Sequence, residues 1–538
     1  MPQSLPFGVS CKGGLNTNLN QFEMLSNPGL ATKLENFEVD SDGGYRRING
    51  FEPFGGGDAA RPNSTNAILG LFVYADGLIA CSGTNIYFTL DGETWLQINR
   101  ASVAGGGDDY SAFTGRSALA RTNQNQCNFA FYEGDTQYGE LLITDEASAT
   151  KPFYFKMTGT GALSNRTYFA KEVTVSGTVY PIVGVIHDKH YVVSGDSNNP
   201  NTIYYSGTND IDDFTSTGSG NIKLDDKVIG LKSFRDDLII FCKNSIYKLV
   251  NINTSSTIAV VPVTKNVGCL DNHSIQEIAG DLVFLSPDGV RTIAGTARIG
   301  DVELGTVSRQ IVSITETIAN GIDSYVVATV VLRQKSQYRL FYTTSGAGSS
   351  QAKGLIGSIT SQGFQWSETK GIQATAITSG FNSNGIEKTY HGDDDGYVYI
   401  HNSGSVFYHE GAAASMRATY ETPNYDFGDF GTRKNINYVK ISITPEGTSQ
   451  PVLRVRYNYA DPDFPQPDDY TLLSVPLPAI FGESLFGTGV FGASNDPMVR
   501  QAVQGGGHTT NFRLRTEDSN PPYAINGMYI DYTPSNRR

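Results

Sequence analysis

Residues 68–88 read ILGLFVYADGLIACSGTNIYF, and the same order of features returns twice further along the chain. Residues 182–207 contain IVGVIHDKHYVVSG and then NTIYYSG, and residues 228–249 read VIGLKSFRDDLIIFCKNSIYKL. Each copy has an aliphatic pair, a glycine, an apolar strand, a polar turn and a second strand, and an Asn shortly before Ile-Tyr then opens a third strand. The Asn, Asp and Gly residues at the turns tolerate the backbone angles that tight hairpins need.

Weaker copies of this unit occupy residues 274–295, 336–369 and 374–402, and a further copy is expected between Tyr110 and Lys156. Antiparallel hairpin units that return about every 40 to 50 residues are typical of a β-propeller, because a single blade cannot bury both of its faces alone. We therefore predict an all-β chain whose middle part, residues 61–405, forms a β-propeller of six or seven blades.

The two flanks of this region lack the repeat. Residues 1–60 show little alternation and end in a Gly-rich run, so we expect an extended N-terminal arm and linker. Residues 406–538 contain longer strands, in one of which Leu453, Val455 and Tyr457 alternate with polar residues. Such alternation fits a strand that is solvated on one face, and it predicts a C-terminal β-sandwich.

The composition bounds the class of protein. At 538 residues the chain is longer than one core usually serves, so two or three domains are expected. Its 59 Gly, 29 Tyr and 28 Phe residues, with only 17% charged residues, favour short strands and tight turns over helices. The formal charge of −14 disfavours a protein that grips nucleic acid through basic patches, since such binding depends on Lys and Arg displacing counterions from phosphates.

The cysteines and the N-terminus indicate where the protein is made. The five cysteines are an odd number without a CxxC pair, so we expect buried, reduced thiols rather than a disulfide framework or a zinc site. The opening MPQSLPFGVSCKGG lacks the basic start and apolar run of a secretion signal, and no apolar stretch of 18 residues occurs. A soluble chain that is made in the cytosol and has no membrane span is predicted.

One short motif raises the question of an enzyme. Asp91, Gly92, Thr94 and Trp95 nearly reproduce the Ser-x-Asp-x-Gly-x-Thr-Trp box of sialidases, but the residue between Asp and Gly is missing. Sialidases repeat this box and need clustered arginines for the substrate carboxylate, whereas this chain has one degenerate copy. In propellers the Asp ties a hairpin turn by accepting from backbone amides, and the Trp packs under the next blade. We therefore favour a structural turn.

A run of carboxylates is also interpreted as a turn. HGDDDGYVYIH at 391–401 sets Asp393, Asp394 and Asp395 beside a histidine, but the three are consecutive rather than alternate, as an EF-hand loop needs. We expect a solvated hairpin tip and no metal. The chain has no GxSxG, HExxH or Gly-Lys dipeptide, and its two tryptophans offer little for stacking on sugars. No catalytic residue and no cofactor is predicted.

A glycine-rich segment near the end leaves two alternatives open. FGESLFGTGVFG at 481–492 repeats an aromatic-Gly step and carries little charge. It is either a flexible loop that packs on a neighbouring subunit or an irregular loop that folds back on its own sandwich.

Several motifs together suggest a family. The N-terminal segment has a Gly-Gly start, then Leu34-x-Asn36, and then Gly-Gly-Tyr45-Arg46-Arg47-x-x-Gly50. IYYSGTNDIDDFT, VIGLKSFRDDLIIFCKNSIYKLV and DLVFLSPDGVRTI follow, and YDFGDFGTRKNINYVKISI and INGMYIDYTPSNRR stand near the end. With these motifs the chain resembles the β-propeller tail proteins of tailed bacteriophages, which include the tail-nozzle and packaged-DNA stabilisation proteins of short-tailed phages.

The resemblance implies a non-enzymatic virion protein that is assembled in the host cytoplasm. Such a subunit forms a ring, expected to be a homohexamer, below the portal and its adaptor, with the head-tail connector and tail fibre proteins as partners. The phage DNA passes through without sequence-specific binding and is held back sterically until ejection. The motifs do not separate a nozzle from a neighbouring hub component. A receptor-binding or tail-fibre protein and a propeller glycosidase remain the alternatives.

The N-terminal arm has two interpretations of its own. An apolar but weakly periodic segment gains burial mainly by packing on another chain, so Tyr45, Arg46 and Arg47 are candidate inter-subunit contacts to a neighbour or to the adaptor. Alternatively, these three residues fasten the arm to its own propeller. The sequence does not decide between the two.

Overall fold

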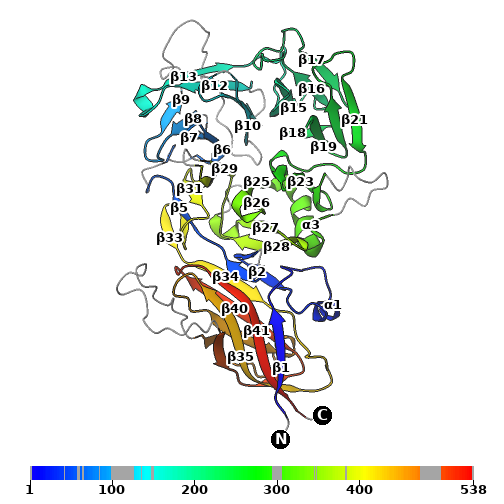
Figure 1. The fold of residues 1–538 in the computed structure, drawn as a ribbon, viewed down its shortest axis with the longest axis vertical. Helices are drawn as coiled ribbons and strands as arrows, with labels where there is room; N and C mark the ends of the chain where they lie inside the picture. The colour runs from blue at the N-terminus through cyan, green and yellow to red at the C-terminus, as the bar shows by residue number, and fades with distance from the viewer. Residues whose placement is uncertain are drawn as a thin grey trace.

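The fold is all-β and contains a β-propeller, which forms the upper part of Figure 1. Seven antiparallel sheets succeed one another along the chain and close into a ring, so the prediction of a six- or seven-bladed propeller is confirmed. Among the residues that the structure describes, six of these blades have four strands and one has three. The computed structural model describes residues 3–40, 43–56, 61–62, 66–83, 85–98, 126–134, 136–146, 151–293, 306–344, 346, 348–381, 385–472 and 498–535.

The strands of each blade follow one another in sequence. The first four blades comprise β6 (Ile68–Tyr74), β7 (Gly77–Ser82), β8 (Asn85–Thr89) and β9 (Leu96–Ile98); β10 (Cys127–Tyr132), β11 (Glu140–Asp145), β12 (Phe153–Thr158) and β13 (Thr167–Glu172); β14 (Val183–His187), β15 (His190–Ser194), β16 (Thr202–Tyr205) and β17 (Gly220–Lys223); and β18 (Val228–Phe234), β19 (Asp237–Cys242), β20 (Ile246–Val250) and β21 (Ala259–Thr264). The last three comprise β22 (Gln276–Ile278), β23 (Asp281–Ser286) and β24 (Gly289–Thr292); β25 (Tyr325–Leu332), β26 (Gln337–Thr344), β27 (Lys353–Thr360) and β28 (Gly363–Lys370); and β29 (Ala376–Phe381), β30 (Glu387–Gly392), β31 (Val398–His401) and β5 (Phe51–Pro53).

The seventh blade is closed by a strand from the start of the chain. β5 pairs antiparallel with β31, and the buried Phe51 ring packs against His391 and Tyr399. Gly50 allows the chain to enter, because a Cβ there would lie 1.9 Å from the backbone oxygen of Val406. The N-terminal segment therefore completes the ring.

The sixth blade continues beyond the propeller as part of a nine-stranded sheet. β28 pairs parallel with β2 (Lys33–Glu35), which pairs antiparallel with β34 (Met416–Glu421). From β34 the sheet continues through β40 (Thr510–Asp518) and β36 (Val452–Tyr457) to β37 (Tyr470–Thr471). The predicted alternation in β36 is confirmed, because Leu453, Val455 and Tyr457 are buried.

A second, seven-stranded sheet shares a hydrophobic core with this extension. It contains β1 (Leu5–Ser10), β3 (Phe37–Val39), β4 (Tyr45–Arg47), β35 (Lys434–Pro445), β38 (Met498–Ala502), β39 (Gly506–Gly507) and β41 (Tyr523–Pro534). Side chains of both sheets, such as Ile441 and Leu514, lie in one core cluster. We call the two layers the C-terminal sheet pair; it forms the lower part of Figure 1, where β1 and β41 lie side by side.

Short elements fill the connections. β32 (Phe407–His409) and β33 (Ala412–Ala414) form a hairpin after the last blade. The helices in the described part of the chain are α1 (Gln21–Leu25), α3 (Val312–Asn320) and the 3-10 turns η2 (Leu163–Asn165), η3 (Asn272–Ser274), η4 (Arg309–Ile311), η5 (Ile322–Ser324), η6 (Arg333–Lys335), η7 (Ser349–Gln351) and η8 (Asn458–Ala460). Among the helices in the described ranges, none has the length and apolar character needed to cross a membrane. All five cysteines are free and buried, as predicted.

Two sequence expectations concern the flanks. Residues 3–40 and 43–56 supply strands to both C-terminal sheets and to the seventh blade, so this segment packs along its own chain rather than extending from it. The predicted loop FGESLFGTGVFG at 481–492 lies outside the described residues.

Candidate functional site

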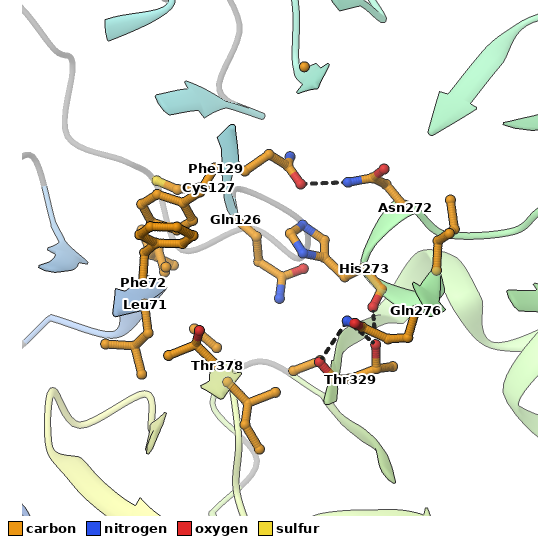
Figure 2. A pocket seen from close by; sticks show the side chains of 18 of the residues that line it. Leu71, Phe72, Gln126, Cys127, Phe129, Asn272, His273, Gln276, Thr329 and Thr378 are labelled. Atoms are coloured by element: carbon orange, nitrogen blue, oxygen red, sulfur yellow. Dashed lines mark hydrogen bonds between the residues drawn. The ribbon is translucent and has the colours of Figure 1, made fainter. Parts of the chain in front are cut away.

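A polar cavity of about 230 Å³ lies where the innermost strands of the blades meet at the axis of the ring. Every blade contributes to its lining: β6, β10, β14, β18, β25 and β29 from six blades, and η3 with β22 from the three-stranded one. Figure 2 shows Gln126 near the middle of this space and the stacked rings of Phe72 and Phe129 at one side, with centroids 5.4 Å apart. We call it the axial cavity.

Amide side chains cross the axial cavity. Gln126, just before β10 of the second blade, donates from Nε2 to the backbone oxygens of Val327 (2.9 Å) and Thr375 (2.7 Å), which belong to the sixth and seventh blades. Asn272 of the fifth blade donates from Nδ2 to Oδ1 of Asn128 in the second, over 2.5 Å. Each bond joins blades that are not neighbours, so the axis is obstructed by the chain's own side chains.

One ion pair also joins blades across the axis. Nε2 of His273 lies 3.2 Å from Oε1 of Glu146, which joins the fifth blade to the second. Burial opposes the charge on His273, but the hydrogen bond and charge of Glu146 outweigh it and raise its pKa. Burial raises the pKa of Asp271 to about 6, although the charge of His273 acts to lower it. Burial lowers the pKa of Lys232, although the negative charge of Glu277 acts to raise it. The pair of His273 and Glu146 holds the fifth blade to the second, and its geometry fits a structural role.

The sialidase-like motif forms the predicted turn. Oδ1 of Asp91 accepts from the backbone amides of Glu93 (2.9 Å) and Thr94 (3.1 Å). The indole of Trp95 donates to the backbone oxygen of Gly92 over 3.0 Å, and its ring packs on a cluster that includes residues of the first and seventh blades. Gly92 has φ +80°, a conformation that favours glycine. The structural interpretation is confirmed.

The carboxylate run at 393–395 differs from the expected solvated tip. Asp393 and Asp394 are only 5% and 8% exposed. Asp393 accepts from the backbone amide of Tyr397 (2.8 Å) and from the hydroxyl of Tyr399 (3.0 Å), and burial raises its pKa to about 7. The expectation of a solvated tip was therefore wrong, because neighbouring segments cover this turn. Within the described ranges, no group of His, Cys, Asp and Glu residues is arranged to hold a metal ion.

Tyr45, Arg46 and Arg47 lie in β4 and bind residues of their own chain. The buried Tyr45 donates its hydroxyl proton to the backbone oxygen of Gly29 over 2.6 Å. Arg47 is fully buried and donates from Nη1 to Oδ1 of Asp518 over 2.5 Å. Side chains enclosed in this way cannot serve as inter-subunit contacts, so that prediction is corrected for Tyr45 and Arg47. The Tyr45 ring packs on Tyr420 of β34, with centroids 5.0 Å apart, and Arg47 bonds Asp518 of β40, so both fasten the N-terminal segment to the C-terminal sheet pair rather than to the propeller.

Arg46 belongs to a buried ion cluster centred on Glu38. Glu38 accepts from Nη1 of Arg46 (2.7 Å), Nζ of Lys335 (2.7 Å) and Nη2 of Arg339 (2.9 Å). Burial opposes the charge on Glu38, but the three cations outweigh it and lower its pKa to about 2. Arg46 also donates to the carboxylate of Glu446. This Glu38 cluster thus joins β3 and β4 of the C-terminal sheet pair to the sixth blade, and Glu446 extends it to the residue that follows β35.

The sequence motifs did not indicate the residues that carry these links. Glu38 stands between the apolar residues Phe37 and Val39. A carboxylate with apolar neighbours on both sides is a sequence signal for a buried, paired charge. Gln126 and Arg339 gave no signal, because their partners come from strands that are far away in the sequence.

No protein-family model and no curated protein matches the chain. Among solved structures, the N-terminal domain of Nup159 is similar with a TM-score of 0.34 and 14% identity, covering 54% of this chain and 77% of that one. The WD40 domain of Pan2 from Neurospora crassa gives 0.32 and 10%, covering 62% and 88%. An ancestral GH74 enzyme gives 0.37 and 9%, covering 74% and 52%. At these scores the fold rests on the chain's own sheet topology.

Proposed function

We propose that the protein is a structural subunit of a bacteriophage tail: a ring-forming nozzle or hub component below the portal and its adaptor. The motifs from Leu34 to Gly50 and from the middle and end of the chain support this proposal. The observation that carries it is the nine-stranded sheet that runs from β25–β28 through β2 into β34, β40, β36 and β37. A shared sheet fixes the angle between propeller and C-terminal sheet pair, and a closed ring of identical subunits needs such a fixed shape.

The N-terminal segment strengthens this connection. It places β2 between blade and C-terminal sheet, contributes β5 to the propeller, and buries Glu38 among cations from both parts. Because β2 is hydrogen-bonded to β28 on one side and to β34 on the other, the two parts are expected to move as one body. The proposed subunit is therefore a rigid building block whose role depends on shape and not on turnover.

The path of the DNA follows from the axial cavity. Since Gln126 and Asn272 bond across the propeller axis, the duplex cannot pass through a single propeller. The conduit of the proposed ring is the opening between subunits. A formal charge of −14 suits such a conduit, because DNA that finds few Lys and Arg contacts slides rather than binds. Retention of the genome is then steric.

The mass of the purified assembly tests this function. A homohexamer has about six times the 58.2 kDa of the subunit. Native mass spectrometry or light scattering at two salt concentrations distinguishes this from a trimer, which is expected for a tail fibre. A stable monomer at micromolar concentration argues against the ring. Incubation with host polysaccharide tests the glycosidase alternative, and release of reducing sugar in proportion to the protein would contradict a purely structural role.

A further inference from the structure

A second cavity, of about 150 Å³, opens between the sixth and seventh blades and the β32–β33 hairpin. Its inner wall is made by the buried residues His391, Asp393 and Tyr399, and its rim includes the exposed residues Ser350 and Glu410. Tyr408, from β32, also lines it. We call it the rim pocket, because it runs from the surface to a buried wall.

One polar atom in the wall of the rim pocket has no partner. Nε2 of His391 is buried, makes no hydrogen bond in the structure, and belongs to a side chain with 0% exposure. Nδ1 of the same ring faces Nδ1 of His401 over 3.3 Å. His391 lines the rim pocket, whereas His401 does not. A buried polar atom without a partner costs about 1–3 kcal/mol, which a ligand atom can recover.

The hydrogen bonds of the two rings fix which atoms carry protons. A guanidinium can only donate, and Nη1 of Arg339 lies 3.0 Å from Nε2 of His401, so that nitrogen accepts. Burial lowers the pKa of both imidazoles, that of His391 to about 3, so both are neutral. His401 therefore carries its proton on Nδ1 and donates it to Nδ1 of His391. It follows that His391, which lines the rim pocket, carries its own proton on Nε2 as an N–H donor without a partner.

This assignment restricts the chemistry of a ligand. A nitrogen that carries a proton cannot ligate a metal ion, so a metal site at His391 is disfavoured. The carboxyl groups of Asp393, Asp395 and Glu410 line the same space and disfavour an anion. A hydroxyl group can bond to the imidazole and to a carboxylate at once. Its oxygen accepts a hydrogen bond from the His391 N–H, and its O–H donates a hydrogen bond to a carboxylate.

We propose that the rim pocket binds a neutral polyhydroxylated molecule, a single sugar ring or a small polyol, with one hydroxyl bridging His391 and an aspartate. A cavity of this volume accommodates a six-membered ring, since a cavity of about 150 Å³ is known to hold benzene. The rings of Tyr399 and Tyr408 offer apolar surface for the C–H face of such a ligand. Ser350 at the rim supplies a further hydroxyl partner.

Ligand-observed NMR on the full-length protein tests this proposal. The probes are D-glucose, D-galactose, N-acetyl-D-glucosamine and glycerol, with acetate and Zn²⁺ as the anionic and metallic comparisons. We expect saturation transfer to at least one sugar or polyol and none to acetate, with no binding of Zn²⁺ by calorimetry. His391→Phe and Asp395→Asn should each weaken binding about tenfold. Asp236→Asn, at an exposed turn, is the matched control and should leave binding unchanged.

Every outcome of this experiment bears on the proposal. Binding of none of the sugars or polyols, or binding that both variants leave unchanged, overturns it and leaves a pocket filled by water. If His391→Phe is shown by circular dichroism to be misfolded, Asp395→Asn at the partly exposed side of the pocket carries the test alone. Methyl glycosides of the sugars that bind then separate two sources of the ligand. If a methyl glycoside binds as tightly as the free sugar, the ligand is the end residue of a glycan; if it binds more weakly, the ligand is a free sugar. The result is independent of the mass of the assembly.

Discussion

Nη2 of Arg339 in the sixth blade donates to Oε2 of Glu38 in β3 over 2.9 Å, with both side chains almost fully buried. The two residues are about 300 positions apart in the sequence, so their contact joins the N-terminal segment to the propeller. A buried ion pair adds little net stability over an apolar pair, but removing one partner leaves the other charge buried and unpaired. The contact therefore holds the two parts in one arrangement.

Replacement of Glu38 tests this contact. Glu38→Gln leaves Arg339, Lys335 and Arg46 without their common carboxylate, and we expect the free energy of unfolding to fall by about 3 kcal/mol. The measurement is urea unfolding followed by tryptophan fluorescence. Glu93→Gln, at an exposed turn, is the control and should change stability by less than about 0.5 kcal/mol. Equal midpoints for the two variants would contradict the assigned role of Glu38.

Stability should respond to pH in two opposite ways. The pKa of Glu38 is about 2 in the folded chain, below its ordinary 4.5, so its contribution is complete above about pH 4.5 and is lost as the pH falls toward 2. The pKa of Asp393 is about 7, above its ordinary 3.8, so its contribution is complete below 3.8 and is lost as the pH rises through 7.

The Asp393→Asn variant isolates the second effect. Relative to this variant, the wild-type protein should lose up to about 1.4 kcal/mol of stability per pH unit as the pH rises from about 4 to 7. Urea unfolding at several pH values in that window gives the difference. A constant offset between the two proteins across the window would show that Asp393 is ionised in the folded chain.

Gln126 is expected to stabilise the closed ring. Gln126→Leu removes the two donors to Val327 and Thr375 and leaves their backbone oxygens without this partner, at a cost of about 1–3 kcal/mol. Gln97→Leu removes an exposed amide donor that bonds Asn85 and should have little effect. Thermal unfolding of both variants provides the comparison. A loss no larger for Gln126→Leu than for Gln97→Leu would mean that the axial bonds do not stabilise the ring.

Phe51 tests closure of the seventh blade by β5. Phe51→Ala leaves a cavity beside His391 and Tyr399 and should lower the free energy of unfolding by about 3–5 kcal/mol. Hydrogen exchange should increase first in β31, the partner of β5. Phe22→Ala removes a ring that is 80% exposed and is the control. Unchanged exchange in β31 would show that the blade is closed without the Phe51 ring.

Local sequence patterns predicted the blades well. In ILGLFVYADGLIACSGTNIYF the three expected strands correspond to β6, β7 and β8, because the apolar runs and the turn residues between them agree with each other. The outer strands β9, β17 and β21 gave no comparable signal, since an outer strand has few apolar neighbours and its sequence is less constrained.

Long-range pairing was beyond the reach of these patterns. β2 has three residues and lies between β28 and β34, and nothing in Lys33–Glu35 indicates partners more than 300 positions away. Asp393 looked solvated because three consecutive carboxylates usually are. Its burial arises where separate parts of the chain meet, which also explains why the rim pocket could not be predicted from the sequence.

Electron microscopy of the purified assembly tests the central claim most directly, namely that rigid subunits surround a conduit that no single propeller provides. We predict closed rings in which the propellers lie around a central opening, each with its own axis displaced from that opening and blocked. Single particles of one subunit, or an assembly whose opening coincides with a propeller axis, would contradict this account.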